Sequence, residues 1–183
     1  MDLVNRILAS RDLRKKIADN RDRLYRVALA WCGDPMVADD LVQETLVIAL
    51  QRSGQLRDKE RLNAWMYTIL SNAWKQHLRS MRPTVDIDDT DIVSDGDAES
   101  GCCEQEIVDH VRRAILKLPV GQRQTLTLVD LGGFSYAEVA DVLDIPTGTV
   151  MSRLYSARQS LQKALTRVRA PRPAQTPYLR RVK

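Results

Sequence analysis

The sequence is poor in the residues on which most enzymes and disulfide-bonded proteins depend. It has three cysteines, an odd number, and Cys102 and Cys103 are adjacent, so they do not make a disulfide framework. Their spacing to His110 fits no common zinc motif. The other histidine, His77, is paired with no nucleophile, and no glycine-rich phosphate-binding loop occurs. We therefore expect no metal, no cofactor, no small-molecule substrate and no catalytic activity.

Long apolar runs and aromatic residues are also scarce. The sequence has no run of about 18 apolar residues, the length that a membrane span needs. The N-terminus lacks the apolar core of a signal peptide. The only phenylalanine is Phe134, so leucine, valine, isoleucine and alanine carry most of the apolar surface. No alternating strand pattern persists, whereas helical spacing recurs along the chain. We expect an all-α protein in the cytoplasm, without insertion into a membrane.

Charge is unevenly distributed along the chain. The formal net charge is +4, but residues 84–106 hold nine acids and no lysine or arginine, so the rest of the chain carries +13. Two basic parts joined by an acidic segment are typical of nucleic-acid binders, although an ordinary solvated surface can have the same pattern. The acidic segment is also poor in apolar residues, which predicts a flexible linker.

Apolar residues at helical spacing predict a helical part on each side of this linker. In the first part, an apolar face from Leu24 to Trp31 ends at Gly33, and Asp34-Pro35 then opens a helix to about Gln51. The remaining helices are predicted within Leu3–Ile17, along the stripe from Leu62 to His77, from Ile107 to Leu118 and from Pro119 to about Leu131.

A helix-turn-helix is predicted from Ser135 onward. Ser135 and Glu138 form a capping box at the start of the short helix Tyr136–Leu143. Residues 144–146 turn the chain, and a second helix runs from Thr147 to about Val168. A short helix, a tight turn and a longer helix that enters the major groove are typical of DNA-binding proteins.

The second helix divides into a buried and an exposed face at about 100° per residue. Val150, Leu154 and Leu161 lie on the buried side. Arg153 and Arg158 flank the exposed side, where they would contact phosphates while neutral polar residues sample base edges. The candidate DNA-binding residues of this helix are Thr149, Met151, Ser152, Arg153, Tyr155, Ser156, Arg158 and Gln159.

The first part carries an acidic helix face. Asp40 and Glu44 lie at i,i+4, a spacing at which like charges weaken a helix by about a few tenths of a kcal/mol. Asp39 and Gln43 lie beside them. A basic partner would turn this face into a docking site, and a solvated acidic surface is the alternative.

The next helix carries a polar, largely basic stripe instead. Its members are Thr68, Asn72, Lys75, Arg79 and Arg82. Trp65, Tyr67 and Trp74 interleave with this stripe or adjoin it, with Trp65 on the apolar side. A basic stripe with aromatic platforms suits a DNA strand whose bases have been unstacked.

Two sets of motifs resemble the extracytoplasmic-function group of bacterial sigma factors. Residues 39–46 (DDLVQETL) and 63–79 (NAWMYTILSNAWKQHLR) are similar to sigma region 2. Residues 118–123 (LPVGQR), 133–140 (GFSYAEVA) and 145–154 (IPTGTVMSRL) are similar to sigma region 4. The similarity runs in the family's order from about Asp22 to Leu165.

The resemblance implies a division of the chain and a set of partners. Residues 1–83 would form the region 2 domain, 84–106 the acidic flexible linker, 107–170 the region 4 domain, and 171–183 a basic, proline-containing tail. The partners would be promoter DNA, the beta and beta-prime subunits of core RNA polymerase, and an anti-sigma factor that holds the protein inactive in the bacterial cytoplasm.

The resemblance also implies roles for particular residues. Those of the acidic face, Asp39, Asp40, Gln43 and Glu44, would bind the coiled coil of the beta-prime subunit. The −10 element would be contacted by Asn72, Lys75, Arg79 and Arg82. The helix from Thr147 would read the −35 element while its domain docks on the flap of the beta subunit. The acidic linker would pass through the active-site cleft and the RNA exit path.

Four positions depart from the family's pattern. Gln76 stands where aspartate is frequent, and Met151 and Ser156 stand where basic residues are common, so the DNA sequence that is read stays undefined. Asp144 replaces the usual turn glycine, but aspartate tolerates the left-handed conformation better than most residues do. The alternative function is a stand-alone helix-turn-helix repressor, which would bind palindromic operators as a dimer.

Overall fold

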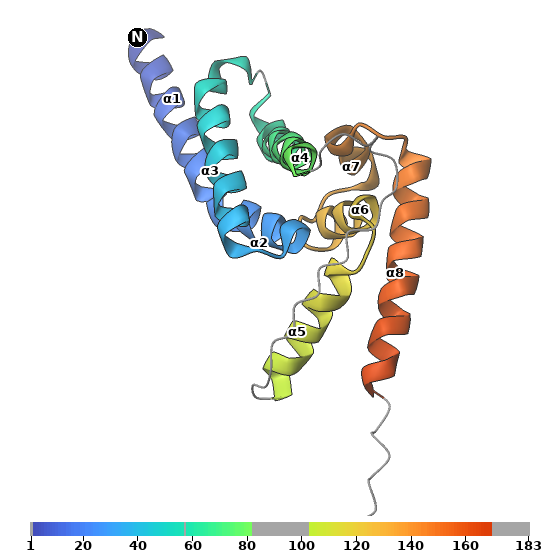
Figure 1. Cartoon of the computed structure of the whole chain (residues 1–183). Helices are drawn as coiled ribbons and strands as arrows, with labels where there is room; N and C mark the ends of the chain where they lie inside the picture. The colour runs from blue at the N-terminus through green and yellow to red at the C-terminus, as the bar shows by residue number, and fades with distance from the viewer. Residues whose placement is uncertain (1, 57, 82–102, 170–183) are drawn as a thin grey trace, which may run out of the picture.

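A computed structural model describes residues 2–56, 58–81 and 103–169 of the chain (Figure 1). The described residues are helical and include no strand, which confirms the all-α prediction. The first part contains α1 (Asp2–Asp19), α2 (Arg21–Cys32), α3 (Pro35–Gln51), the 3-10 turns η1 (Ser53–Gln55) and η2 (Lys59–Arg61), and α4 (Leu62–Ser80). The second part contains α5 (Cys103–Leu116), α6 (Val120–Asp130), α7 (Tyr136–Leu143) and α8 (Thr147–Arg169).

The junction between α2 and α3 forms as its residues predict. Gly33 ends α2 in the left-handed conformation, with φ at 74°, and its N–H donates to Leu29 O at 2.8 Å. Asp34 then caps α3, since its carboxylate accepts from the backbone N–H groups of Met36 and Val37 at 2.7 and 3.3 Å. Pro35 occupies the first helical position, where no N–H is needed.

Each part has an apolar interior. In the first part, the fully buried side chains include Ile17 on α1, Leu24 and Trp31 on α2, Val42 on α3 and Leu70 on α4. In the second part, Leu118, Leu126, Leu154 and Ala157 form a cluster between α6 and α8. These are the faces that helical spacing predicts.

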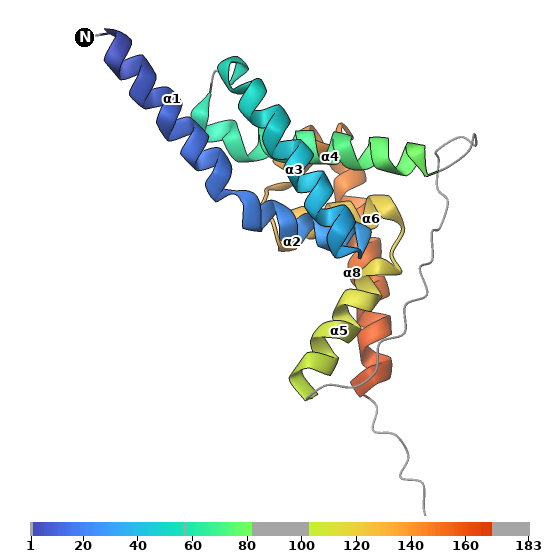
Figure 2. The same cartoon turned by 60° about the vertical axis from the view of Figure 1, so that its left-hand side comes forward.

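The two parts pack directly against each other. α4 packs against α7 and α2 packs against α6, and Figure 1 shows α7 beside α4, while Figure 2 shows the same packing turned by 60°. Phe134, Val139, Val142 and Leu143 of the second part belong to the same buried apolar cluster as the core of the first. The sequence predicts two helical parts, but it does not predict this packing.

The acidic linker lies largely outside the described residues, and α5 begins at Cys103, within the segment predicted as linker. Among the helices of the described ranges, none is long and apolar enough to cross a membrane.

Candidate nucleic-acid interface

The helix-turn-helix is built by local contacts. The Ser135 hydroxyl accepts from the Glu138 N–H at 3.3 Å, and the Glu138 carboxylate accepts from the Ser135 N–H at 2.8 Å, which completes the predicted capping box. The hydrogen bonds from Ser135 hold the pKa of the Glu138 carboxyl below its ordinary value. After α7, Asp144 adopts the left-handed conformation with φ 57° and ψ 54°, so the turn forms without glycine.

The exposed face of α8 is neutral and partly apolar. Met151 and Tyr155 project from it, with 53% and 68% of their surface exposed. Ser152 and Gln159 lie on the same face and are exposed, whereas Thr149 and Ser156 are half-buried at its edges. Four of these six candidate DNA contacts are therefore exposed, and Thr149 and Ser156 are less so.

Two of the arginines of α8, Arg153 and Arg158, lie against α6. Arg153 lies over Gly121 of α6 so closely that a Cβ there would come within 2.8 Å of Arg153 Nη1. Arg158 donates to the Asp130 carboxylate at 2.7 Å, and this hydrogen bond raises the pKa of the guanidinium. Both side chains were predicted to flank the face with their charges directed at phosphates. In this structure the Arg158 side chain pairs with Asp130 and stays 52% exposed, and the half-buried Arg153 lies against Gly121.

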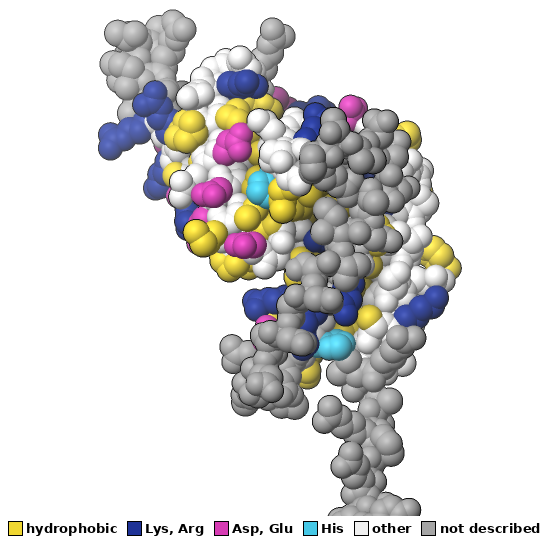
Figure 3. Space-filling view, viewed as in Figure 1, with side chains coloured by type: hydrophobic (Ala, Val, Ile, Leu, Met, Phe, Trp, Pro, Cys, Tyr) yellow, Lys and Arg dark blue, Asp and Glu magenta, His cyan; other side chains and the backbone are white. Residues whose placement is uncertain are grey.

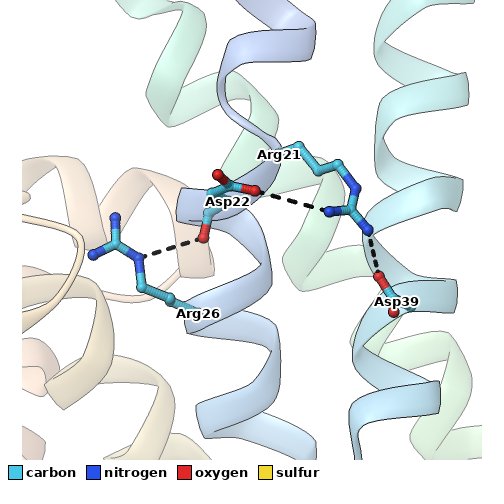
Figure 4. Close-up of polar contacts among 4 residues, drawn as sticks. All are labelled: Arg21, Asp22, Arg26 and Asp39. Atoms are coloured by element: carbon cyan, nitrogen blue, oxygen red, sulfur yellow. Dashed lines mark hydrogen bonds and ion pairs between the residues drawn. The ribbon is translucent and has the colours of Figure 1, made fainter.

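On the acidic face of α3, one of the three carboxylates forms an ion pair within the molecule. Asp40, Gln43 and Glu44 are exposed on one side of the helix. Asp39 instead accepts from Arg21 of α2 at 2.7 Å (Figure 4). Both members of that pair are about half exposed to solvent, so the pair contributes little to stability.

A groove of about 230 Å³ runs beside this face, between α3 and α4. Asp40 and Glu44 line one wall, and Gln76, His77 and Ser80 line the other. In Figure 3, acidic side chains lie among apolar ones next to a histidine on this side of the molecule. The surface combines negative charge with apolar area, which is suited to an amphipathic basic partner.

The basic stripe of α4 lies next to the second part. Asn72 and Arg79 are exposed, but Lys75 is half-buried and its Nζ donates to Leu143 O at the end of α7, at 3.4 Å. Arg82, the fourth predicted DNA contact of this helix, lies outside the described residues.

In this packed arrangement, Tyr67 and Trp74 are not the exposed aromatic platforms that the sequence predicts. Tyr67 and Trp74 are only 2% and 5% exposed. The Tyr67 ring packs edge-on against Phe134 of the second part, at 4.8 Å between centroids, and Trp74 stacks on His77 at 5.5 Å. Trp65 is half-buried. As long as the two parts are packed together, the rings of Tyr67 and Trp74 are therefore not available to stack on bases.

Sequence reasoning missed a polar contact that joins the two parts. Trp31 Nε1 donates to Thr127 Oγ1 at 2.6 Å, and Arg123 Nη1 donates to Trp31 O at 2.6 Å. Arg123 Nη2 also donates to Leu118 O at 3.2 Å. Burial lowers the pKa of the Arg123 guanidinium. Residues 118–123 (LPVGQR) match a family motif, but no pattern in the sequence indicates that Arg123 is buried.

The described cysteine side chain, that of Cys32, is half-buried and donates to Asp34 O at 3.2 Å. Burial raises the pKa of this thiol. No group of three or more metal-binding side chains occurs within the described ranges. Cys102 lies outside those ranges, and the side chain of Cys103 is not described.

Comparisons with known proteins agree with both sets of motifs. The family model for sigma-70 region 2 matches residues 17–84, and that for sigma-70 region 4 matches residues 109–161. The chain is similar to the ECF RNA polymerase sigma factor EcfG of Rhodopseudomonas palustris, with 34% identity over 84% of each chain. It is also similar to the RNA polymerase sigma-H factor of Pseudomonas aeruginosa, with 33% identity over 78% of this chain and 80% of the relative.

A solved structure resembles the fold of both parts together. The sigma factor RpoE of Bartonella quintana, crystallised in complex with the anti-sigma factor NepR, superposes with a TM-score of 0.69 at 27% identity. The superposition covers 85% of this chain and 97% of that one.

Proposed function

The chain belongs to the extracytoplasmic-function group of the sigma-70 family, and on this basis we propose that it is an alternative sigma factor that binds core RNA polymerase and directs it to promoters. It acts in the bacterial cytoplasm, where it supplies recognition and has no catalytic chemistry of its own. Residues 1–83 dock on the polymerase and open the −10 element, and residues 107–170 read the −35 element. The acidic segment 84–106 links the two.

One observation favours this function over a stand-alone repressor. The chain has both a helix-turn-helix and a second, separate surface on α3, where Asp40, Gln43 and Glu44 are exposed beside the groove. A repressor has no need of such a face, whereas a polymerase subunit needs a docking surface as well as a DNA-reading surface. The acidic charge complements a basic partner.

Duplex binding with and without core polymerase tests the proposal. We expect little sequence-specific binding of promoter DNA by the full chain alone, and specific binding together with promoter-dependent transcription once core polymerase is added. Tight specific binding by the chain alone, unchanged by polymerase, would instead support the repressor. Pseudo-palindromic sites bound by a dimer would point the same way.

The packed arrangement bears on how the protein is controlled. Elements centred near −10 and −35 are about 25 base pairs apart, or about 85 Å at 3.4 Å per step. In the packed form Lys75 of the α4 stripe donates to Leu143 O in the helix-turn-helix, so the two DNA-facing surfaces are adjacent and cannot span that distance. The two parts must separate when the promoter is engaged.

We further propose that an anti-sigma factor stabilises the packed form. The similarity to RpoE, whose structure contains its anti-sigma factor NepR, extends over 97% of that chain and so includes both parts. An inhibitor that binds the two parts at once would make their separation more costly, because any ligand specific for one state shifts the equilibrium toward that state.

Thr127→Val is expected to favour separation of the two parts. The substitution leaves the buried Trp31 Nε1 without an acceptor, which costs about 1–3 kcal/mol in the packed form only. The ratio of separated to packed molecules should rise about tenfold. Pulsed electron-spin distance measurements would detect this change in the ratio. The spin labels would be attached at the exposed positions of Lys15 and Lys163, in a chain whose native cysteines are replaced by serine.

Thr125→Val is the matched control. Thr125 is buried on the same helix, but its hydroxyl donates to Gly121 O, within the second part. Identical distance distributions for the two variants would show that the Trp31–Thr127 bond does not hold the parts together.

A further inference from the structure

Met151 and Tyr155 form an apolar pair on the DNA-facing side of α8. They are four residues apart, so both side chains project from one face of the helix. Both are more than half exposed, whereas Val150 and Leu154 on the same helix are buried. Scattered exposed apolar residues are ordinary on a protein surface, but here two of them occupy the centre of a recognition face.

Several polar side chains around this pair also have contacts within the second part. Ser152 Oγ donates to Thr149 O at 3.0 Å, and Gln159 Nε2 donates to Tyr155 Oη at 3.1 Å. Arg158 is paired with Asp130, and Arg153 lies over Gly121. Met151 and Tyr155 are therefore the large apolar side chains that α8 offers to a DNA duplex, beside the exposed polar groups of Ser152, Arg158 and Gln159.

In the major groove of DNA, the C5-methyl group of thymine is the apolar feature that a protein can contact. Guanine and cytosine are recognised there by hydrogen bonds, most often from arginine, lysine, glutamate or aspartate, and neither member of the pair is one of these. We propose that Met151 and Tyr155 determine −35 specificity by packing against thymine methyl groups. This inference rests on the proposed function, because it needs α8 in the major groove.

The geometry limits which thymines are read. Four residues of α-helix span about 6 Å along the axis, which corresponds to about two base steps of 3.4 Å. The two sensitive positions should therefore lie within about two base pairs of each other. Tyr155 Oη accepts a hydrogen bond from Gln159, so its own proton remains available for a phosphate or base acceptor while the ring is held in place.

Single-methyl substitution in the promoter tests the inference. The −35 preference is first selected from a randomised promoter library with the reconstituted holoenzyme, and each thymine of the element, on either strand, is then replaced by deoxyuridine. Deoxyuridine removes only the C5-methyl group and leaves base pairing intact. We expect promoter binding to weaken about fourfold at each contacted position, the equivalent of one buried methyl group.

Protein variants then assign each methyl to a side chain. Met151→Ala should abolish the deoxyuridine effect at one position, and Tyr155→Ser should abolish it at the other. Tyr155→Phe keeps the ring and should keep the effect. Ser160→Ala, on the same helix and exposed but outside the recognition face, is the control and should change nothing.

Three results would overturn the inference: a selected element made only of G·C pairs, insensitivity to deoxyuridine at every position, or deoxyuridine effects that persist in both Met151→Ala and Tyr155→Ser. In each of these cases the holoenzyme still transcribes from a −35-dependent promoter, so the proposed function stands. Failure of the holoenzyme to select any −35 element would contradict the proposed function itself.

Discussion

Replacing Asp40 and Glu44 together by lysine is expected to abolish association with core polymerase. Both carboxylates are exposed on one face of α3, beside the groove toward α4. Reversing them would place positive charge against a basic partner, and like charges at an interface cost several kcal/mol. The dissociation constant should rise at least about 100-fold, as measured by titration of fluorescently labelled core polymerase.

The fold should survive this change, because neither side chain is buried and Asp39, which pairs with Arg21, is left intact. Asp12→Lys with Asp19→Lys is the matched control, since it makes the same change in net charge on the exposed side of α1. Equal loss of polymerase binding in both double variants would mean that the change in net charge, and not the α3 face, causes the loss. Full promoter-dependent transcription by the α3 variant would contradict the docking assignment.

Lys75→Glu with Arg79→Glu is expected to block opening of the −10 element while leaving polymerase binding intact. The two side chains belong to the basic stripe of α4, where they would contact the backbone of the unpaired strand. Replacing two attractions by two repulsions should slow open-complex formation at least about tenfold. The fluorescence of 2-aminopurine placed in the −10 element reports that step.

Two comparisons make this second test specific. Lys15→Glu with Lys16→Glu, on the exposed side of α1, makes the same change in net charge. Arg79→Glu alone separates DNA contact from the packing of the two parts, because Lys75 also donates to Leu143 O. Normal promoter opening by Arg79→Glu and by the double variant would rule out the α4 stripe as the strand-binding surface.

The features that could be predicted from the sequence are those with local causes. The start of α3 follows from Asp34 and Pro35, and the start of α7 follows from the capping box between Ser135 and Glu138. The left-handed conformation of Asp144 likewise depends on the tolerance of a single residue type. In each case the interacting groups are within four residues of each other, so the pattern is visible in the printed chain.

What could not be predicted depends on residues far apart in the chain. The contacts of Trp31 with Arg123 and Thr127 join residues 92 and 96 positions apart. Helical spacing places Tyr67 on α4 but cannot show that Phe134 will cover its ring. The positions of Arg153 and Arg158 on α8 were predicted, but their neighbours Gly121 and Asp130 belong to another helix.

The contact of Arg123 with the first part has a consequence for how the protein responds to ionic strength. Arg123 is 7% exposed, its guanidinium donates to two backbone carbonyls, and it forms no ion pair with a carboxylate of the described residues. Mobile ions weaken the attraction between exposed opposite charges. The contact between the buried Arg123 guanidinium and neutral carbonyl oxygens should therefore depend little on ionic strength. Promoter binding, by contrast, releases counterions and weakens steeply as salt rises. A rise in cellular salt would therefore lower the affinity of the protein for DNA but would change the stability of the packed form little.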